Sequence, residues 1–306
     1  EEGRLNAIRE CIGCNICYSG DSLGVPIRCT QNPTMGEEWR RGWHPEVIAT
    51  KGSDARVLIV GAGAAGLEAA RALGARGYAV MLAEASREIG GRITREAALP
   101  GMSEYIRVRD YRAQQLIEMP NVEIFRESLM TAQDVMAVDA AHVAIATGAK
   151  WRTERFDEER YLPIATSEAA GRVFTPDDIM DGTLPDGPTL VFDGDEYYMG
   201  GVIAERIRAE GNKVTYVTAS DSVSSWAGNT AERRRIRAHL MRLGIGVETA
   251  QILSAFDGRE ALLHCAYTDA ERTVAVRNIV MVTARRPNDG LYRALRDGSE
   301  TLPFSL

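Results

Sequence analysis

The sequence predicts an α/β protein in which two three-layer domains follow a cysteine-rich segment. Four of the five cysteines lie between residues 11 and 29. A pattern of strand, turn, helix and strand then starts at residue 56 and is repeated from residue 189. Because strands that alternate with helices build parallel sheets covered by helices, each repeat predicts one α/β domain. The expected divisions are residues 1–50 for the cysteine-rich segment, 51–175 with 285–306 for the first domain, and 176–284 for the second.

The composition indicates a globular protein with an acidic surface. The 306 residues are 45% hydrophobic and carry a net charge of −7, which is enough for two domains with cores of their own. The acidic balance argues against nucleic acid as a partner. No apolar run reaches the length of a membrane span, and the N-terminus does not read as a secretion signal. We therefore expect a cytoplasmic protein with no membrane partner.

The cysteines form the spacing C-x2-C-x2-C-x11-C. Three thiolates at this spacing on a short loop, closed by a fourth from further along the chain, are typical of a [4Fe–4S] cluster. Zinc is an alternative, although structural zinc sites more often consist of two separate C-x2-C pairs or include His. Two disulfides are the other alternative, disfavoured without a secretion signal. Residues 1–50 are rich in Pro and Gly and are expected to hold little regular structure. The predicted ligands are Cys11, Cys14, Cys17 and Cys29.

A glycine-rich turn follows the first predicted strand. The apolar strand at residues 56–60 leads into Gly-Ala-Gly-Ala-Ala-Gly, a helix at 67–76 and a strand at 79–83, which ends in Glu84. This is the G-x-G-x-x-G pattern of a Rossmann-like domain of the FAD/NAD(P)-binding type, with an acid about 20 residues on for the ribose hydroxyls. The acid disfavours a ligand with a 2′-phosphate. The predicted nucleotide contacts are Gly61, Ala62, Gly63, Gly66 and Glu84.

Two further segments are expected beside this turn. Gly91 and Arg92 are candidate contacts to the ribose or pyrophosphate, with an ordinary turn as the alternative. A helix at 109–118 and strands at 121–124 and 142–146 are predicted to complete this half, and the small-residue turn at 147–149 suits a close approach to a dinucleotide.

The second repeat has the same pattern but a degenerate turn. A strand at 189–192, a helix at 199–209 and a strand at 213–217 are predicted. Between the first two, residues 193–200 read Asp-Gly-Asp-Glu-Tyr-Tyr-Met-Gly, with three carboxylates and two tyrosines where a phosphate would bind. Charge repulsion and bulk should exclude a pyrophosphate. We therefore interpret this half as a nucleotide-binding fold that has lost its nucleotide.

The remaining segments give weaker signals. A basic helix is predicted from Asn229 to Leu243, with a capping arrangement in residues 229–232. Strands around 246–256, 261–267 and 272–282 are expected to form an antiparallel appendage. The chain is expected to end at Leu306 without another strand and helix to complete the first domain.

Taken together, these motifs resemble the trimethylamine dehydrogenase family, which includes dimethylamine and histamine dehydrogenases and is related to 2,4-dienoyl-CoA reductase. The resemblance covers essentially the whole chain. It is carried by residues 11–17, 29–32, 36–38, 40–46, 61–66, 98–101, 109–112 and 146–149.

The resemblance implies the following. An N-terminal barrel that carries FMN oxidises the amine, electrons pass to the [4Fe–4S] cluster at the four cysteines and then to an electron-transferring flavoprotein, and the full-length protein is a homo-oligomer. The first domain holds an ADP without a redox role, where relatives hold FAD. The FMN barrel is not among these residues, so this chain is expected to be the electron-transfer and ADP-binding portion of such an enzyme. Arg107 stands where the trimethylamine enzyme has a Tyr on its route to the partner, which leaves the docking contacts open.

Two alternatives remain at this point. The first alternative is a reductase with FAD at residues 61–66 and NADPH in the second domain. The carboxylates at 193–196 argue against this reductase. The second alternative is a structural module in which cluster and ADP only stabilise the fold, since no general base, nucleophile or substrate pocket is visible.

Overall fold

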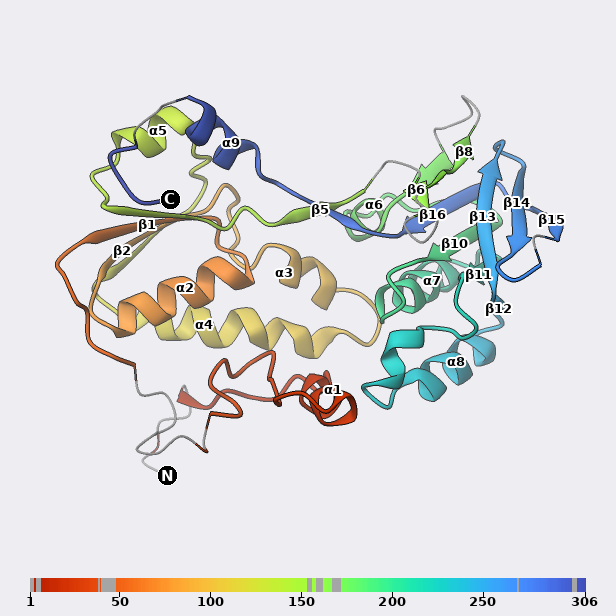
Figure 1. The fold of residues 1–306 in the computed structure, drawn as a ribbon, viewed down its shortest axis with the longest axis horizontal. Helices are drawn as coiled ribbons and strands as arrows, with labels where there is room; N and C mark the ends of the chain where they lie inside the picture. The colour runs from red at the N-terminus through yellow and green to blue at the C-terminus, as the bar shows by residue number, and fades with distance from the viewer. Residues whose placement is uncertain are drawn as a thin grey trace.

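The computed structural model describes residues 3, 7–37, 39, 48–152, 156–157, 162–166, 172–268, 270–298 and 302–306. Figure 1 shows two α/β units side by side, joined by extended chain, with the N-terminal segment lying along one side of both. Residues 40–46, which contribute to the resemblance, lie outside the described residues.

The first unit is built on a parallel sheet in the order β3-β2-β1-β4. This order is typical of a nucleotide-binding half-sheet. Helices α2, α3 and α4 lie on one face and α5 and α9 on the other (Figure 1). The strands are β1 Arg56–Val60, β2 Ala79–Ala83, β3 Val122–Phe125 and β4 His142–Ile145, and the helices are α2 Ala64–Ala75, α3 Arg92–Ala97, η2 Ser103–Ile106, α4 Arg107–Ile117 and α5 Ala132–Ala137.

The end of the chain returns to this first sheet. Helix α9 (Gly290–Asp297) buries Leu295, and Phe304 is only 8% exposed in the same apolar cluster as β1 and β4. Ser305 forms a parallel bridge with His142. The expectation that no further helix follows was wrong, because the amphipathic helix α9 and the last residues cover apolar side chains of this sheet.

The second unit has a parallel sheet in the order β12-β11-β10-β16-β9. One face packs on helices and the other on a smaller sheet in the order β15-β14-β13-β8. The parallel strands are β9 Val173–Phe174, β10 Thr189–Asp193, β11 Val214–Val217, β12 Gly246–Glu248 and β16 Asn278–Val282. The smaller sheet has β8 Ala165–Thr166, β13 Gln251–Phe256, β14 Glu260–Cys265 and β15 Glu271–Ala275, and the helices are α6 Pro176–Met180, α7 Met199–Ala209, η4 Ser225–Gly228 and α8 Arg233–Arg242.

The structure confirms the α/β class with parallel sheets and corrects further details. The predicted strand at 246–256 is two strands, β12 in the parallel sheet and β13 in the smaller sheet. The predicted strand at 272–282 is two strands, because the backbone amides of Val276 and Arg277 bond to different segments and the chain passes from the antiparallel sheet to the parallel one. Helix α8 begins after Glu232 without a side-chain cap, so the predicted capping arrangement was wrong. Helix α1 (Ile16–Leu23) lies within the cysteine-rich segment, where little regular structure was expected.

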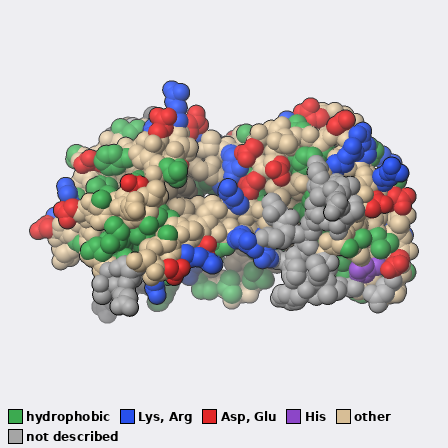
Figure 2. Space-filling view, turned by 90° about the horizontal axis from the view of Figure 1, so that it is seen from above, with side chains coloured by type: hydrophobic (Ala, Val, Ile, Leu, Met, Phe, Trp, Pro, Cys, Tyr) green, Lys and Arg blue, Asp and Glu red, His purple; other side chains and the backbone are tan. Residues whose placement is uncertain are grey.

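The two units are joined by an antiparallel pair of strands, β5 (Ala149–Trp151) and β17 (Arg285–Pro287). A short hairpin of β6 (Phe156–Asp157) and β7 (Leu162–Pro163) follows β5. In the view of Figure 2 the molecule has two lobes, and basic and acidic side chains are interspersed on the face drawn.

Candidate functional site

The glycine-rich turn (residues 61–66) connects β1 to α2, and two of its glycines are required by the fold itself. Gly61 has φ +105°, and a Cβ there would lie 2.4 Å from the carbonyl oxygen of Ala146. A Cβ on Gly66 would lie 1.8 Å from the carbonyl oxygen of Gly61. Gly63, the N-cap of α2, has no atom within 4 Å of the position of a Cβ. The turn therefore packs tightly underneath and leaves open space at the N-terminus of α2, where backbone N–H groups favour an anion.

Glu84 fixes this turn from the end of β2. Its side chain is largely buried, with the residue 9% exposed, and its Oε2 accepts a hydrogen bond from the backbone amide of Ala62 over 2.7 Å. Its Oε1 accepts from the amide and the hydroxyl of Ser86, at 2.9 and 2.6 Å. A carboxylate oxygen has more than one acceptor site, so these bonds leave capacity for a ribose hydroxyl. The acid thus lies beside the turn, as the pattern predicted.

Gly91 and Arg92 are placed differently from one another. The amide of Gly90 donates to the carbonyl of Ala62 over 2.8 Å, and a Cβ on Gly91 would lie 3.3 Å from the Cα of Gly63. The Arg92 guanidinium instead donates to the carbonyl of Ala149 and lies 3.7 Å from the carboxylate of Asp177, on the way to the second unit. Burial lowers the pKa of Arg92, and the nearby Asp177 opposes that change. The structure thus places Gly91 against the turn and the Arg92 guanidinium against the chain that joins the two units.

A contact beside the turn was not predicted. The Thr147 hydroxyl donates to the carbonyl of Asn288 over 2.6 Å, and the Asn288 amide group donates to the carbonyl of Thr147 over 3.1 Å. The segment after β17 is thereby fixed to the loop after β4. The similar strand-then-small-turn patterns at residues 142–149 and 280–288 are the signal that relates the two segments.

The cysteine segment (residues 7–37) lies along α4 and the second unit (Figure 1). All four predicted ligands are free thiols, Cys11 exposed and the others partly exposed. Among the described residues there is no group of three or more His, Cys, Asp or Glu side chains placed to hold a single metal ion. A four-iron cluster requires a different arrangement, because each thiolate binds its own iron. The chemistry of the donor set, four cysteine thiols without a disulfide, fits such a cluster.

A buried network attaches this segment to the first unit. Arg112 of α4 is 4% exposed, and its guanidinium lies 2.7 Å from a carboxylate oxygen of Glu68 in α2. It also donates to the side-chain oxygen of Gln31 over 2.8 Å. The Gln31 amide group in turn donates to the carbonyl of Glu10 over 3.1 Å. Gln31 is two residues from Cys29 and Glu10 is next to Cys11, so one arginine supports the chain beside both ends of the cysteine motif.

Arg107 lies at the exposed side of the motif. Its guanidinium donates to the carbonyl of Cys11 over 2.8 Å and pairs with the carboxylates of Glu104 at 2.7 Å and Glu10 at 3.4 Å. Arg107 therefore contacts the backbone of a predicted ligand, Cys11.

The degenerate turn (residues 193–200) holds a buried carboxylate at the N-terminal side of α7. Asp193 is fully buried and accepts hydrogen bonds from the hydroxyl of Tyr216 and from the amide of Glu196. Burial raises the pKa of Asp193 to about 7. A Cβ on Gly200, in the first turn of α7, would lie 2.4 Å from the Asp193 side chain. The Asp193 side chain therefore packs beneath the first turn of α7, against Gly200.

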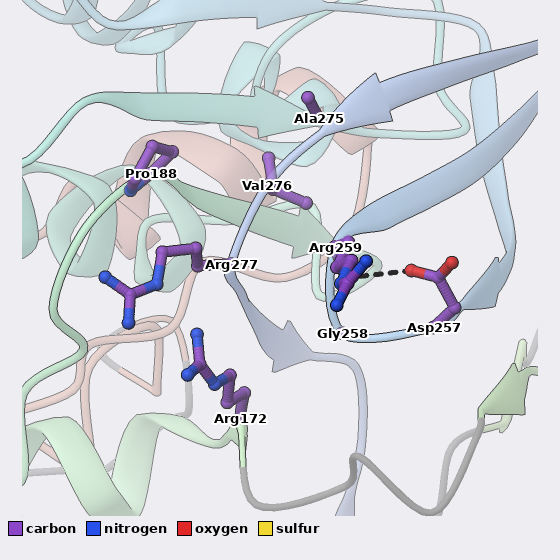
Figure 3. Close-up of a pocket in the computed structure, with 8 residues that line it drawn as sticks. All are labelled: Arg172, Pro188, Asp257, Gly258, Arg259, Ala275, Val276 and Arg277. Carbon is purple, nitrogen blue, oxygen red and sulfur yellow. Dashed lines mark hydrogen bonds between the residues drawn. The ribbon is translucent and has the colours of Figure 1, made fainter.

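Three hollows of the described structure are lined by other segments than the glycine-rich turn. One of about 570 Å³ lies between residues 12–14, the loop at 100–105 and helices α7 and α8, and one of about 240 Å³ is lined by Trp151, Tyr197 and Trp226. A third, of about 510 Å³, is lined by Arg172, Arg259 and Arg277 at the amino ends of β10 and β16 (Figure 3). In Figure 3 the Asp257 carboxylate accepts from the backbone of Arg259, over 2.8 Å. This hollow is at the opposite edge of the sheet from the degenerate turn.

None of the described helices is long and apolar enough to cross a membrane.

Comparisons with known proteins agree with this geometry. Residues 55–301 match the family described as pyridine nucleotide-disulphide oxidoreductase. A dimethylamine dehydrogenase of Hyphomicrobium sp. (strain x) is 37% identical over 97% of this chain and 44% of its own length. The structure of a histamine dehydrogenase from Rhizobium sp. 4-9 is 45% identical, with a TM-score of 0.93, over 97% of this chain and 46% of that one. The structure of a 6-hydroxypseudooxynicotine amine oxidase from Pseudomonas geniculata N1 is 41% identical, with a TM-score of 0.91. The match covers 96% of this chain and 44% of that one. The chain thus spans less than half the length of these relatives.

Proposed function

Because the chain belongs to the pyridine nucleotide-disulphide oxidoreductase family and, within it, to the trimethylamine dehydrogenase group of oxidoreductases, we propose that it is the electron-transfer and ADP-binding portion of an amine dehydrogenase. In the whole enzyme, FMN on an N-terminal barrel would accept electrons from the amine. A [4Fe–4S] cluster held by Cys11, Cys14, Cys17 and Cys29 would supply one-electron transfer toward an electron-transferring flavoprotein. The relatives that extend well beyond this chain support a preceding barrel.

The observation that carries this proposal is the contrast between the two turns. The glycine-rich turn leaves open space at the N-terminus of α2 and has Glu84 beside it. The degenerate turn has the buried carboxylate of Asp193 beneath α7, and Asp195, Tyr197 and Tyr198 line the hollow beside it. An acid for the ribose beside the first turn, and carboxylates and tyrosines that disfavour a phosphate in the second, suit ADP in the first unit and no NADPH in the second. We therefore prefer the amine dehydrogenase to the FAD- and NADPH-dependent reductase.

The proposal extends to the organisation of the protein. We propose a cluster-binding segment at residues 1–50, an ADP-binding Rossmann-like domain at 51–175 with 285–306, and a second Rossmann-like domain without nucleotide at 176–284. Free thiols and a predicted cluster suit the cytoplasm. The partners we propose are the FMN barrel, an electron-transferring flavoprotein and further copies of the full-length chain, with Arg107 at the exposed side of the cluster.

The test is acid release of bound nucleotide from the purified chain, identified by chromatography and mass, together with the iron and sulfide content. ADP with about four irons per chain supports the proposal. FAD, or binding of NADPH at micromolar concentration, would move the chain to the reductase class. If the chain holds ADP and iron, but the enzyme with its barrel transfers no electrons to a flavoprotein acceptor, the result would support the structural module instead.

A further inference from the structure

The loop that carries Cys14 is bonded to the second unit, not only to the first. The hydroxyl of Tyr197 donates to the carbonyl of Cys14 over 3.3 Å. The side-chain amide of Asn15 donates to the carbonyl of Thr230 over 3.1 Å. These contacts join residues that are 183 and 215 positions apart in the sequence. The second unit therefore contributes directly to the conformation of the cysteine motif.

Both partners in the second unit are firmly held. The Tyr197 ring makes edge contacts with Tyr198 and with Trp226, with centroids 4.8 and 4.6 Å apart. Such ring pairs contribute about 0.5–1.5 kcal/mol each beyond the area that they bury. Thr230 is fully buried, and its hydroxyl donates to the carbonyl of Ala227 over 3.1 Å.

Tyr197 belongs to the degenerate turn, and it separates two hollows. One hollow faces the cysteine loop and the other faces the inside of the degenerate turn, and Tyr197 lines both. The tyrosine that is expected to disfavour a phosphate in this turn is therefore the one whose hydroxyl reaches the Cys14 backbone.

We propose that the degenerate turn has become a support for the cysteine loop, with Tyr197 and Asn15 as positioning residues for Cys14. The effect on a cluster rests on the proposed function, whereas the support of the loop is independent of it. The O–H group of Tyr197 places the positive end of its dipole beside a predicted ligand. Hydrogen bonds and limited solvent exposure around a cluster set its reduction potential. The second unit would thus keep a role in electron transfer after losing its nucleotide.

The experiment compares Tyr197→Phe and Asn15→Gly with Tyr105→Phe. Tyr197→Phe removes one hydroxyl and keeps the ring contacts. Asn15 has φ +53°, so glycine removes the amide group without opposing the left-handed conformation. Tyr105 lines the same hollow and packs on Tyr198, and in the described chain no hydrogen bond joins its hydroxyl to the cysteine segment. Tyr105→Phe is therefore the matched loss of a hydroxyl from a partly buried tyrosine.

The first readout uses the chain after removal of any metal. The rate at which Cys14 is alkylated, relative to Cys29 in the same sample, is measured by mass spectrometry. One hydrogen bond of about 1 kcal/mol predicts a rate about fivefold higher in Tyr197→Phe and in Asn15→Gly, with no change in Tyr105→Phe. Equal rates in all three variants and the wild type would overturn the inference.

The second readout uses the chain with its cluster. We expect Tyr197→Phe to keep its iron and to shift the one-electron reduction equilibrium toward the oxidised form, by up to about tenfold, or about 59 mV. A shift of the same size in Tyr105→Phe, or none in Tyr197→Phe, would contradict a positioning role. A wild-type chain without iron would count against the proposed function alone, because the alkylation rates still decide whether the loop is held.

Discussion

The Oε2 atom of Glu84 accepts a hydrogen bond from the backbone amide of Ala62 over 2.7 Å, so the acid at the end of β2 holds the turn at the end of β1. Glu84, the predicted partner of the ribose hydroxyls, therefore also stabilises the glycine-rich turn. The two roles can be separated, because stability and nucleotide affinity are measured independently.

We expect Glu84→Ala to lower the free energy of unfolding by about 1–3 kcal/mol, since the buried amide of Ala62 loses its partner. Urea denaturation measures this loss. Calorimetric titration with ADP should show at least about a tenfold weaker affinity, the value of roughly one charge-assisted hydrogen bond. Glu88→Ala is the control, because Glu88 is exposed on the same loop. If the two variants unfold alike, Glu84 does not hold the turn.

The glycines of the turn allow a sharper separation of fold from binding. Gly66→Ala should destabilise the protein by about 3 kcal/mol or more, because its Cβ would lie 1.8 Å from a backbone oxygen that cannot move aside cheaply. Gly63→Ala should change stability by less than about 1 kcal/mol, because the Cβ meets open space. It should nevertheless weaken ADP, since the methyl group occupies the space that the pyrophosphate would approach. Thermal unfolding and ADP titration of both variants measure the difference, and a Gly63→Ala protein with unchanged ADP affinity would place the nucleotide elsewhere.

Arg112 offers a test of how the cysteine segment is attached. We expect Arg112→Ala to cost about 1–3 kcal/mol, because the side chain of Gln31 loses its buried partner and Glu68 loses one arginine while it keeps Arg71. Limited proteolysis should then cleave within residues 7–37 at a higher rate. Arg293→Ala removes an exposed arginine that pairs with Asp289 one turn away, and it should change stability by less than about 0.5 kcal/mol. Equal proteolysis of the two variants would show that Arg112 is not what retains the segment.

Sequence patterns predicted the elements that depend on neighbouring residues. Strand β1 and helix α7 have the expected bounds, because the apolar run ends at Gly61 and the helical run ends shortly before Gly211. The tight packing under Gly61 and Gly66 also follows from a local motif. The α/β class follows from the order of these elements.

The failures have a common physical cause. The break at Val276 depends on which sheet offers hydrogen-bond partners, and the N-cap residue of α1, Asn15, bonds to Thr230 of the second unit, so neither is encoded in local periodicity. The direction of the Arg92 side chain depends on Asp177, which lies far away in the sequence. The bond from Tyr197 to Cys14 joins residues 183 positions apart. Single-sequence reasoning could recognise that the degenerate turn excludes a phosphate, but not what its tyrosine contacts instead.

The buried Asp193 predicts a pH dependence of stability with a defined sign. Its pKa is about 7 in the folded protein, mainly because of burial, against an ordinary value of 3.8. Between these values the folded state binds a proton that the unfolded state has lost, so the stability from this group is complete below about pH 4 and decreases as the pH rises through about 7. In Asp193→Asn this contribution does not titrate. The stability of the variant relative to the wild type should therefore rise by about 1.4 kcal/mol per pH unit over that interval and then remain constant.

Asp257→Asn supplies the control of opposite sign. Hydrogen bonds from the backbone amides of Glu260 and Arg259 lower the pKa of Asp257 below 3.8, so its contribution is present above that value and is lost as the pH falls further. Urea denaturation of the three proteins from pH 3 to pH 8 distinguishes the two behaviours. Parallel curves for Asp193→Asn and the wild type between about pH 4 and 7 would mean that the acid is already ionised in the folded protein. The carboxylate beneath α7 would then be charged at neutral pH and would repel a phosphate that approached this turn.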